Sequence, residues 1–259
     1  MNYSLKEEGD YRFIDEGEGE VLLLLHGLFG ALSNWKDVIE RFSPHYRVVI
    51  PMMPIYEMPV LSTSVKGLSK FIEGFVEFKK LNRMTVLGNS LGGHVALVYS
   101  LKNQHKMHSL VLTGSSGLYE NAMGGSYPKR GDYDYIRKKV EYTFYDPATA
   151  TDELVNEVFD ITNDRMKTLK ILAMAKSAIR HNMRKEVSKI EVPVCLIWGK
   201  DDKITPPEVA EEFNELLPNA ELHWLDKCGH APMMERPEEF NTILEDFLTR
   251  MYHKSYVAS

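Results

Sequence analysis

The sequence of 259 residues lacks any long hydrophobic run, since its longest apolar stretch at a strand-like position is Val21–Leu25. A helix that crosses a membrane needs about 20 consecutive apolar residues, so no membrane span is expected. Residues 1–10 carry charges and no apolar core of the kind that signal peptides have, so export is not expected either. The chain is therefore predicted to be cytoplasmic.

Cysteine and positive charge are also scarce. Two cysteines, Cys195 and Cys228, cannot build a disulfide framework and suit a reducing compartment. The 31 Lys and Arg residues are outnumbered by 37 Asp and Glu residues, and the net charge of -6 argues against a nucleic-acid partner. The hydrophobic share of 44% fits a globular protein with one large domain or two small ones.

What the sequence does contain is an alternation of short apolar runs and helix-length segments. The runs are uninterrupted and end near turn residues, which is typical of strands buried on both faces. They occupy residues 21–25, 46–50, 84–87, 110–112, 194–198 and 221–225. Helical spacing of apolar residues predicts helices at 63–80, 91–101, 206–217 and 237–251. This pattern predicts the α/β class, with a mostly parallel central sheet flanked by helices.

Residues 118–189 interrupt the alternation, because they contain no convincing buried strand. Helical patterns fill the segment, clearest at Met166, Leu169, Leu172, Ile179 and Met183. We therefore expect a helical cap (lid) at 118–189, inserted into a core that consists of residues 1–117 and 190–259. The cap is mildly basic whereas the rest of the chain is acidic. A solvated helical surface and attraction of an acidic substrate both explain that difference.

A glycine-rich turn, Gly88-Asn89-Ser90-Leu91-Gly92-Gly93, stands between one predicted strand and the helix that follows it. A serine on such a sharp turn projects above the sheet, and glycines on both sides relieve the crowding around it. The N-terminus of the next helix places a free N–H group and a partial positive charge beside the hydroxyl. Ser90 is therefore a candidate nucleophile, and a plain glycine turn is the alternative.

A serine nucleophile needs a base, and the base needs a carboxylate that orients it. Such groups project from loops at the carboxyl ends of parallel strands. Asp202 follows one predicted strand and His230 follows the next, with Asp201 and Asp226 as rival carboxylates. The order Ser90, Asp202, His230 is a known order for such a triad.

The remaining histidines and cysteines have structural interpretations. His26 precedes a glycine turn and is expected to shape it, whereas His94 lies one turn into a helix and is expected to be structural. Cys228 is expected to be a packed, inert thiol. The histidine spacing does not suggest a zinc site, so no metal and no cofactor are expected.

These motifs make the sequence resemble the α/β-hydrolase superfamily across nearly its whole length. The resemblance rests on His26-Gly27-Leu28-Phe29-Gly30, the turn around Ser90, Gly199-Lys200-Asp201-Asp202 with Pro206, and Gly229-His230. It implies the α/β-hydrolase fold with a helical cap inserted after the sixth strand. It also implies a triad of Ser90, Asp202 and His230, in which the spacing from the glycine selects Asp202. The oxyanion hole would consist of the backbone N–H groups of Leu28 and Leu91.

The resemblance also bears on the substrate. Serine at position 90 argues against the dehalogenase and epoxide hydrolase branches, which use aspartate there. The turn after His26 looks like that of small cytosolic carboxylesterases, whereas Asn89 and the Tyr145 segment of the cap look like carbon–carbon hydrolases of ring-cleavage products. Those hydrolases carry an arginine and a tryptophan where this chain has Val158 and Ala231, so contacts with an acidic dienoate would be missing. Residues 51–54, Pro-Met-Met-Pro, depart from the aspartate and glycine of many relatives.

The leading hypothesis is a serine hydrolase of the carboxylesterase type that cleaves small to medium acyl esters through an acyl-enzyme. Its expected partner is a small-molecule ester, and Phe29, Asn89, Tyr145, Val158 and Ala231 are the expected pocket residues. One alternative is a carbon–carbon bond hydrolase that acts on vinylogous keto acids. Another is a hydrolase-like protein that binds a ligand without turning it over.

Overall fold

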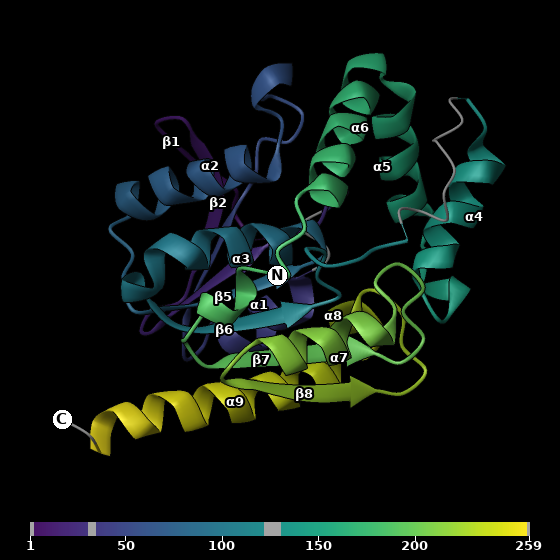
Figure 1. Cartoon of the computed structure of the whole chain (residues 1–259). Coiled ribbons are helices and arrows are strands. Elements are labelled where there is room, and N and C mark those ends of the chain that lie inside the picture. Colours follow the sequence, from purple (N-terminus) through teal and green to yellow (C-terminus); the bar gives the residue numbers. More distant parts are fainter. Residues whose placement is uncertain (1–2, 31–34, 122–130, 258–259) are drawn as a thin grey trace.

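The computed structural model describes residues 3–30, 35–121 and 131–257 around an eight-stranded sheet (Figure 1). The strand order is β1-β2-β4-β3-β5-β6-β7-β8. Strands β1 and β2 pair antiparallel at one edge, and the other strands are parallel to one another. The strands are Lys6–Glu8, Tyr11–Glu16, Val21–Leu25, Arg47–Pro51, Met84–Asn89, Met107–Thr113, Val194–Gly199 and Ala220–Leu225, numbered β1 to β8 in that order.

The six predicted strands are present as β3 to β8, and two were missed. Strands β1 and β2 have no long apolar run, because β1 carries charged residues and only Phe13 and Ile14 of β2 are buried. The prediction of burial on both faces is wrong for β8, in which only Leu225 is fully buried. The reason is its place in the sheet: β8 is an edge strand that pairs with β7 alone.

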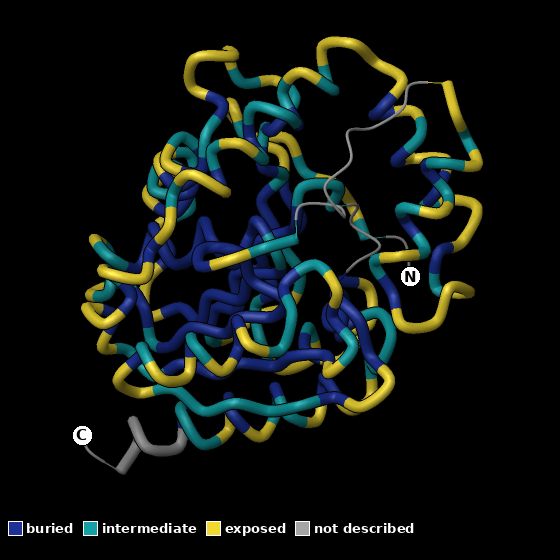
Figure 2. The backbone as a smooth tube through the Cα atoms, turned by 45° about the vertical axis from the view of Figure 1, so that its right-hand side comes forward, coloured by how far each residue is buried: buried dark blue, intermediate teal, exposed yellow. Residues whose placement is uncertain are grey.

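Helices cover both faces of the sheet, and side chains that alternate along each strand separate two apolar layers. One layer joins β3, β5, β6 and β7 to α2, α3 and α7, and the other joins the same strands to α1 and α9. The buried residues of the chain concentrate in this sandwich (Figure 2). These helices are α1 Lys36–Phe42, α2 Val65–Phe78, α3 Leu91–Asn103, α7 Pro207–Leu216, α8 Pro232–Glu235 and α9 Pro237–Val257.

Three helices form the cap between β6 and β7, after the sixth strand as predicted. They are α4 Tyr133–Thr143, α5 Asp152–Asn163 and α6 Arg165–Arg180, and they lie on the side to which the parallel strands point (Figure 1). Residues 122–130 of the expected cap are outside the described residues, and its exact bounds stay a prediction. Among the described residues, the short 3₁₀ helices are η2 Val60–Ser62, η3 Gln104–Lys106, η5 Pro147–Thr149 and η6 Val187–Lys189.

The apolar pattern that predicted α6 is not the face that this helix buries. Met166, Leu169 and Ile179 are exposed, whereas Ile171 and Met174 are buried. The helix packs on α2, and the backbone N–H of Val65 donates to Ser177 Oγ over 3.1 Å. The sequence pattern therefore located the helix but not its orientation.

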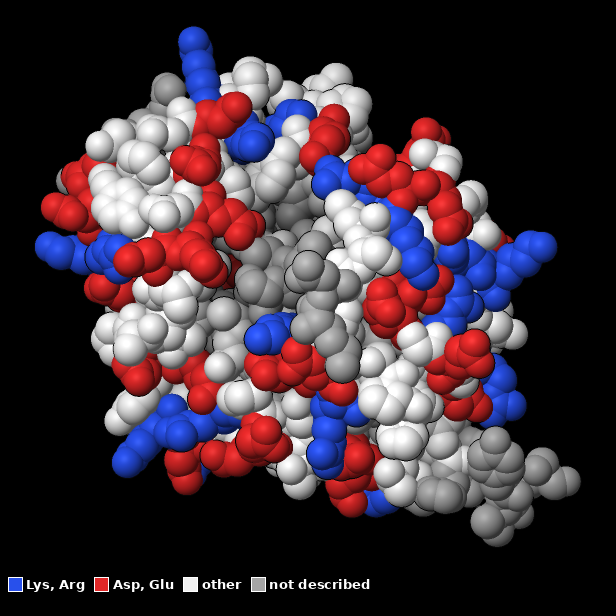
Figure 3. Space-filling view, turned by 180° about the vertical axis from the view of Figure 1, so that it is seen from behind, with Lys and Arg blue, Asp and Glu red and all other residues white. Residues whose placement is uncertain are grey.

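The helices and the charged surface bear on two further expectations. In the described segments, no helix combines the length and the apolar character that a bilayer crossing requires. On the face seen from behind, lysine and arginine side chains do not gather into a single patch (Figure 3).

Candidate active site

Ser90 occupies a strained turn between β5 and α3. Its φ of 55° is in the left-handed region, which L-residues rarely adopt. The glycines around it are required by close backbone approach: a Cβ on Gly88 would lie 2.5 Å from the backbone of Gly92, and a Cβ on Gly92 would lie 2.1 Å from the carbonyl oxygen of Leu25. Only a chain with glycine at these positions can hold the serine between the strand and the helix.

His230 and Asp202 form a buried pair at the carboxyl ends of β8 and β7. His230 Nδ1 lies 2.9 Å from Asp202 Oδ2, and the two residues are 6% and 3% exposed. The other carboxylate oxygen accepts the backbone N–H groups of Ile204, at 2.8 Å, and Thr205, at 2.9 Å. The Thr205 hydroxyl donates to Asp202 Oδ2 over 2.9 Å. These contacts fix the carboxylate and thereby orient the imidazole.

The rival carboxylates are placed elsewhere. Asp226 is exposed and pairs with Lys200 over 2.7 Å. Asp201 is partly exposed, and its backbone N–H donates to the carbonyl oxygen of Cys228. The geometry therefore brings Asp202, and neither rival, to the imidazole of His230.

The environment of His230 favours its protonated form. Burial by itself lowers the pKa of this histidine, but the carboxylates of Asp202, Glu120 and Glu235 together outweigh burial. The pKa of His230 is therefore raised above the usual value of about 6.5. By contrast, burial and the neighbouring His181 lower the pKa of His94 to about 3.

The raised pKa of His230 and the lowered pKa of His94 predict different NMR titrations for the two histidines. The ring resonances of His230 should move with a midpoint above that of a free histidine, because the carboxylate stabilises the imidazolium. Asp202→Asn should lower this midpoint by at least about one pH unit, since it removes a charge in direct contact with the ring. The buried His94 serves as the internal control and should show no titration between pH 5 and 8. Unchanged titration of His230 in Asp202→Asn would contradict the electrostatic account.

The turn after β3 is braced against Ser90. A Cβ on Gly27 would lie 3.4 Å from Ser90 Cβ, so the turn approaches the serine closely. His26 Nδ1 donates to the carbonyl oxygen of Gly27 over 2.9 Å, and its Nε2 accepts the backbone N–H of Met53 over 3.0 Å. His26 thus shapes the turn and ties it to the 51–54 segment, whose departure from relatives had no explanation in the sequence. The Tyr56 hydroxyl donates to the carbonyl oxygen of Leu28 over 3.0 Å.

Two backbone N–H groups flank the serine. Leu91 is the first residue of α3, so its N–H group has no acceptor within the helix. Leu28 lies in the braced turn on the other side. Within the described residues the Ser90 hydroxyl has no hydrogen bond to His230, and contacts of this kind are often loose before substrate binds.

A cavity of about 390 Å³ opens over these groups. This volume lies in the range of small-molecule pockets, about 300–1,000 Å³. Ser90, His230, Leu28 and Leu91 all line it, together with four of the five expected pocket residues: Phe29, Asn89, Val158 and Ala231. Its remaining walls are mostly apolar and come from α4, α5 and α6 of the cap.

Tyr145 is the one expected pocket residue that the structure does not place in this cavity. Its side chain is 43% exposed, whereas the preceding Phe144 is buried and lines the cavity. The chain turns outward after α4, and the backbone N–H of Tyr145 donates to Glu235 over 2.7 Å. The side chain that lines the cavity at this point is therefore that of Phe144 and not that of Tyr145.

Three residues of the site were missed from the sequence. Thr205 donates two hydrogen bonds to Asp202 and follows it by three residues. This spacing was a usable signal, because an Asp side chain often accepts a hydrogen bond from a backbone N–H group a few residues later in the chain. Glu235 accepts the backbone N–H groups of Gly229, at 2.7 Å, and Tyr145, so it ties the histidine loop to the cap. Glu120 lines the cavity, and nothing in its sequence surroundings indicated this.

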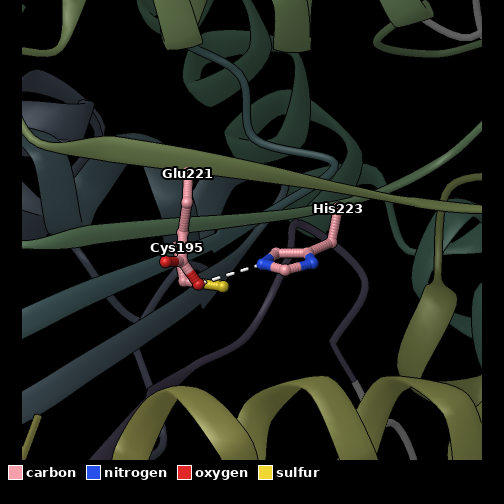
Figure 4. A group of neighbouring side chains, drawn as sticks. All are labelled: Cys195, Glu221 and His223. Carbon is pink, nitrogen blue, oxygen red and sulfur yellow. Dashed lines mark hydrogen bonds and ion pairs between the residues drawn. The ribbon is translucent and has the colours of Figure 1, made fainter. Parts of the chain in front are cut away.

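Cys195, Glu221 and His223 form a group on β7 and β8 whose side chains could in principle hold a metal ion (Figure 4). The carboxylate of Glu221 is already engaged, because Arg250 donates to both of its oxygens, at 3.0 and 2.6 Å. His223 Nε2 also lies 2.9 Å from Glu221. Burial raises the pKa of the Cys195 thiol, which disfavours the thiolate that a metal needs. The group is better described as an ion-pair network.

Comparison with known protein families agrees with this architecture. The sequence model of a family described as alpha/beta hydrolase fold matches residues 20–237. Among curated proteins, a 2-hydroxy-6-oxononadienedioate/2-hydroxy-6-oxononatrienedioate hydrolase of Cupriavidus pinatubonensis is 27% identical over 93% of this chain and 93% of its own length.

Solved structures give the same result. An alpha/beta hydrolase enzyme from the metagenome of sediments of the lagoon of Mar Chica, Morocco, is 44% identical, with a TM-score of 0.79 over 95% of this chain and 98% of its own. A serine hydrolase involved in carbazole degradation is 25% identical, with a TM-score of 0.78 over 92% of this chain and 94% of its own. The region that the family model matches includes every described residue that lines the cavity.

Proposed function

Because the chain belongs to the α/β hydrolase fold family, we propose that it is a serine hydrolase of the carboxylesterase type. The observation that carries the proposal is the convergence of three features on one apolar cavity: the strained Ser90, the His230–Asp202 pair and two backbone N–H groups. This is the arrangement that acyl transfer requires. In this proposal, the N–H group of Leu28, which lies in the braced turn, and the free N–H group of Leu91 bind the oxyanion.

In the proposed mechanism, Ser90 Oγ attacks the carbonyl carbon of the ester while His230 Nε2 accepts the hydroxyl proton. Asp202 holds the imidazole through Nδ1 and stabilises its positive charge. The oxyanion accepts hydrogen bonds from the N–H groups of Leu28 and Leu91. His230 then gives the proton to the departing alcohol oxygen as the C–O bond breaks. Water repeats the sequence on the acylated Ser90 and releases the acid.

The size of the cavity predicts the acyl preference. A volume of about 390 Å³ is small for this type of site, so short and medium acyl chains should fit and long ones should not. We expect kcat/KM for p-nitrophenyl esters to be highest near butyrate and hexanoate and to fall by at least about tenfold at decanoate. Steady-state kinetics on the series from acetate to decanoate measures this. A rise that continues to decanoate would contradict a closed apolar pocket of this size.

A carbon–carbon hydrolase is the second candidate, favoured by the 27% identity to the 2-hydroxy-6-oxononadienedioate/2-hydroxy-6-oxononatrienedioate hydrolase of Cupriavidus pinatubonensis. The cavity itself favours it less, because Val158 and Ala231 line the wall where that branch carries an arginine and a tryptophan. We expect kcat/KM for a 2-hydroxy-6-oxo-dienoate, followed by loss of its visible absorption, to be at least about 100-fold below that for p-nitrophenyl butyrate. The reverse ratio would make carbon–carbon cleavage the function.

The location proposed is the cytoplasm. Both cysteines are free thiols and fully buried, as suits a reducing compartment. Their burial raises the pKa of each thiol, so neither provides a reactive thiolate near the site.

A further inference from the structure

Glu120 is the only acidic side chain among the described residues that line the cavity. It lies on the segment between β6 and the cap, and it faces the imidazole of His230 closely enough for each to affect the pKa of the other. Burial raises the pKa of Glu120, and the facing histidine lowers it by less. A carboxylate in an apolar pocket beside the base has no role in the proposed chemistry, since Asp202 already orients His230.

The position of Glu120 is set by the backbone on both sides. The carbonyl oxygen of Leu118 accepts from Asn182 Nδ2 over 2.7 Å, which ties it to the end of the cap. The backbone N–H of Asn121 donates to the carbonyl oxygen of Ile204 over 2.6 Å, next to the loop that holds Asp202. Glu120 therefore sits on a segment that is anchored two residues before it and one residue after it.

The lysines of the cavity wall lie on the cap helices. Lys139 on α4 lies 5.6 Å from the ring centre of Tyr135 and 5.9 Å from that of Tyr142, in cation–π geometry. Lys176 on α6 is exposed. The positive charge of the wall is thus carried by the cap, whereas the negative charge of Glu120 is beside the reacting groups.

We propose that Glu120 is a specificity-determining residue that excludes substrates with a carboxylate in the acyl part and so selects neutral esters. The inference rests on the proposed esterase function. An anionic acyl chain bound over Ser90 would have to share the apolar cavity with the Glu120 carboxylate. Two like charges that share such a partly desolvated site should weaken binding by about 10- to 50-fold. The proposed substrates are therefore neutral esters, whereas the name of the curated relative specifies a dioate.

Two esters of matched shape test the proposal. p-Nitrophenyl hydrogen glutarate ends in a carboxylate, and p-nitrophenyl 5-methylhexanoate has an isopropyl group in its place. The wild type should prefer the neutral ester by at least about tenfold in kcat/KM. Glu120→Gln should raise the ratio of kcat/KM for the glutarate to kcat/KM for the neutral ester by about 10- to 50-fold. Glu153→Gln removes one negative charge from an exposed position on α5 outside the cavity and should change neither value.

The outcomes separate the inference from the function on which it rests. If the wild type hydrolyses neither ester, the proposed function fails and the inference fails with it. If the wild type hydrolyses the neutral ester but Glu120→Gln leaves the ratio of the two esters unchanged, the function stands and the inference is wrong. Equal rates on both esters in the wild type would also overturn it. A thermal unfolding curve that matches that of the wild type shows that Glu120→Gln is folded.

Discussion

Ser90→Ala should lower kcat/KM for p-nitrophenyl butyrate by about 10⁴-fold while leaving the fold intact. Removal of the hydroxyl abolishes the acyl-enzyme, and what remains is catalysis by the oxyanion site and by binding alone. The fold should persist because alanine retains the Cβ and the backbone geometry of the turn, whose strain is supported by Gly88 and Gly92. Steady-state kinetics and a thermal unfolding curve measure the two effects.

The matched control is Ser116→Ala. Ser116 lines the same cavity, and its hydroxyl donates over 3.4 Å to the carbonyl oxygen of Ser90, yet the proposed mechanism gives it no chemical step. We expect a change of no more than about threefold in kcat/KM. Comparable losses in the two variants would mean that the cavity, and not the nucleophile, is being disturbed, and would remove the basis for assigning the reaction to Ser90.

Asp202→Asn should lower kcat by about 10³- to 10⁴-fold. The substitution keeps the size of the side chain, but an amide cannot stabilise the imidazolium as the carboxylate does. Its NH₂ group would also face His230 Nδ1 and favour the wrong tautomer, as in the known triad case. The measurement is kcat at saturating p-nitrophenyl butyrate, because the loss should appear in the chemical step more than in KM.

Asp201→Asn and Asp226→Asn are the controls for this assignment. Both remove one negative charge from the same region, but Asp226 pairs with Lys200 at the surface and Asp201 does not contact the imidazole. Each should retain activity within about threefold of the wild type. If either variant lost as much activity as Asp202→Asn, the hydrogen bond between Asp202 and His230 would not be the one that matters.

The sequence predicted the fold where local patterns and global packing agree. The apolar runs of β3 to β7 are buried on both faces, so each appears as an uninterrupted run. Edge strand β1 is partly exposed and has no such run, and the other edge strand, β8, was found although its burial was overestimated. Edge strands are defined by which neighbours they lack, and a sequence does not state that.

The residues of the site likewise divide into those that a local sequence pattern predicts and those that only the packed structure reveals. The roles of Gly88 and Gly92 could be predicted because both stand where two backbone segments approach closely. An added Cβ on Gly88, for example, would lie 2.5 Å from backbone atoms. Glu235 and Glu120 act on residues far along the chain, so no local pattern indicates them. Thr205 lies only three residues after the Asp202 that it holds, so its role had a local signal that was missed. Orientation is equally hidden: Tyr145 and Phe144 are neighbours, and only the packing of the cap decides which of them enters the cavity.

The central claim is that Ser90 is an activated nucleophile, and labelling with a fluorophosphonate tests it most directly. The reagent reacts with serines that a neighbouring base activates, and it does not depend on the identity of the natural ester. We expect intact-mass spectrometry to show a single adduct, peptide mapping to place it on Ser90, and Ser90→Ala to remain unlabelled. A folded wild-type protein that takes up no label, or one labelled at another residue, would contradict the account and favour a binding protein without turnover.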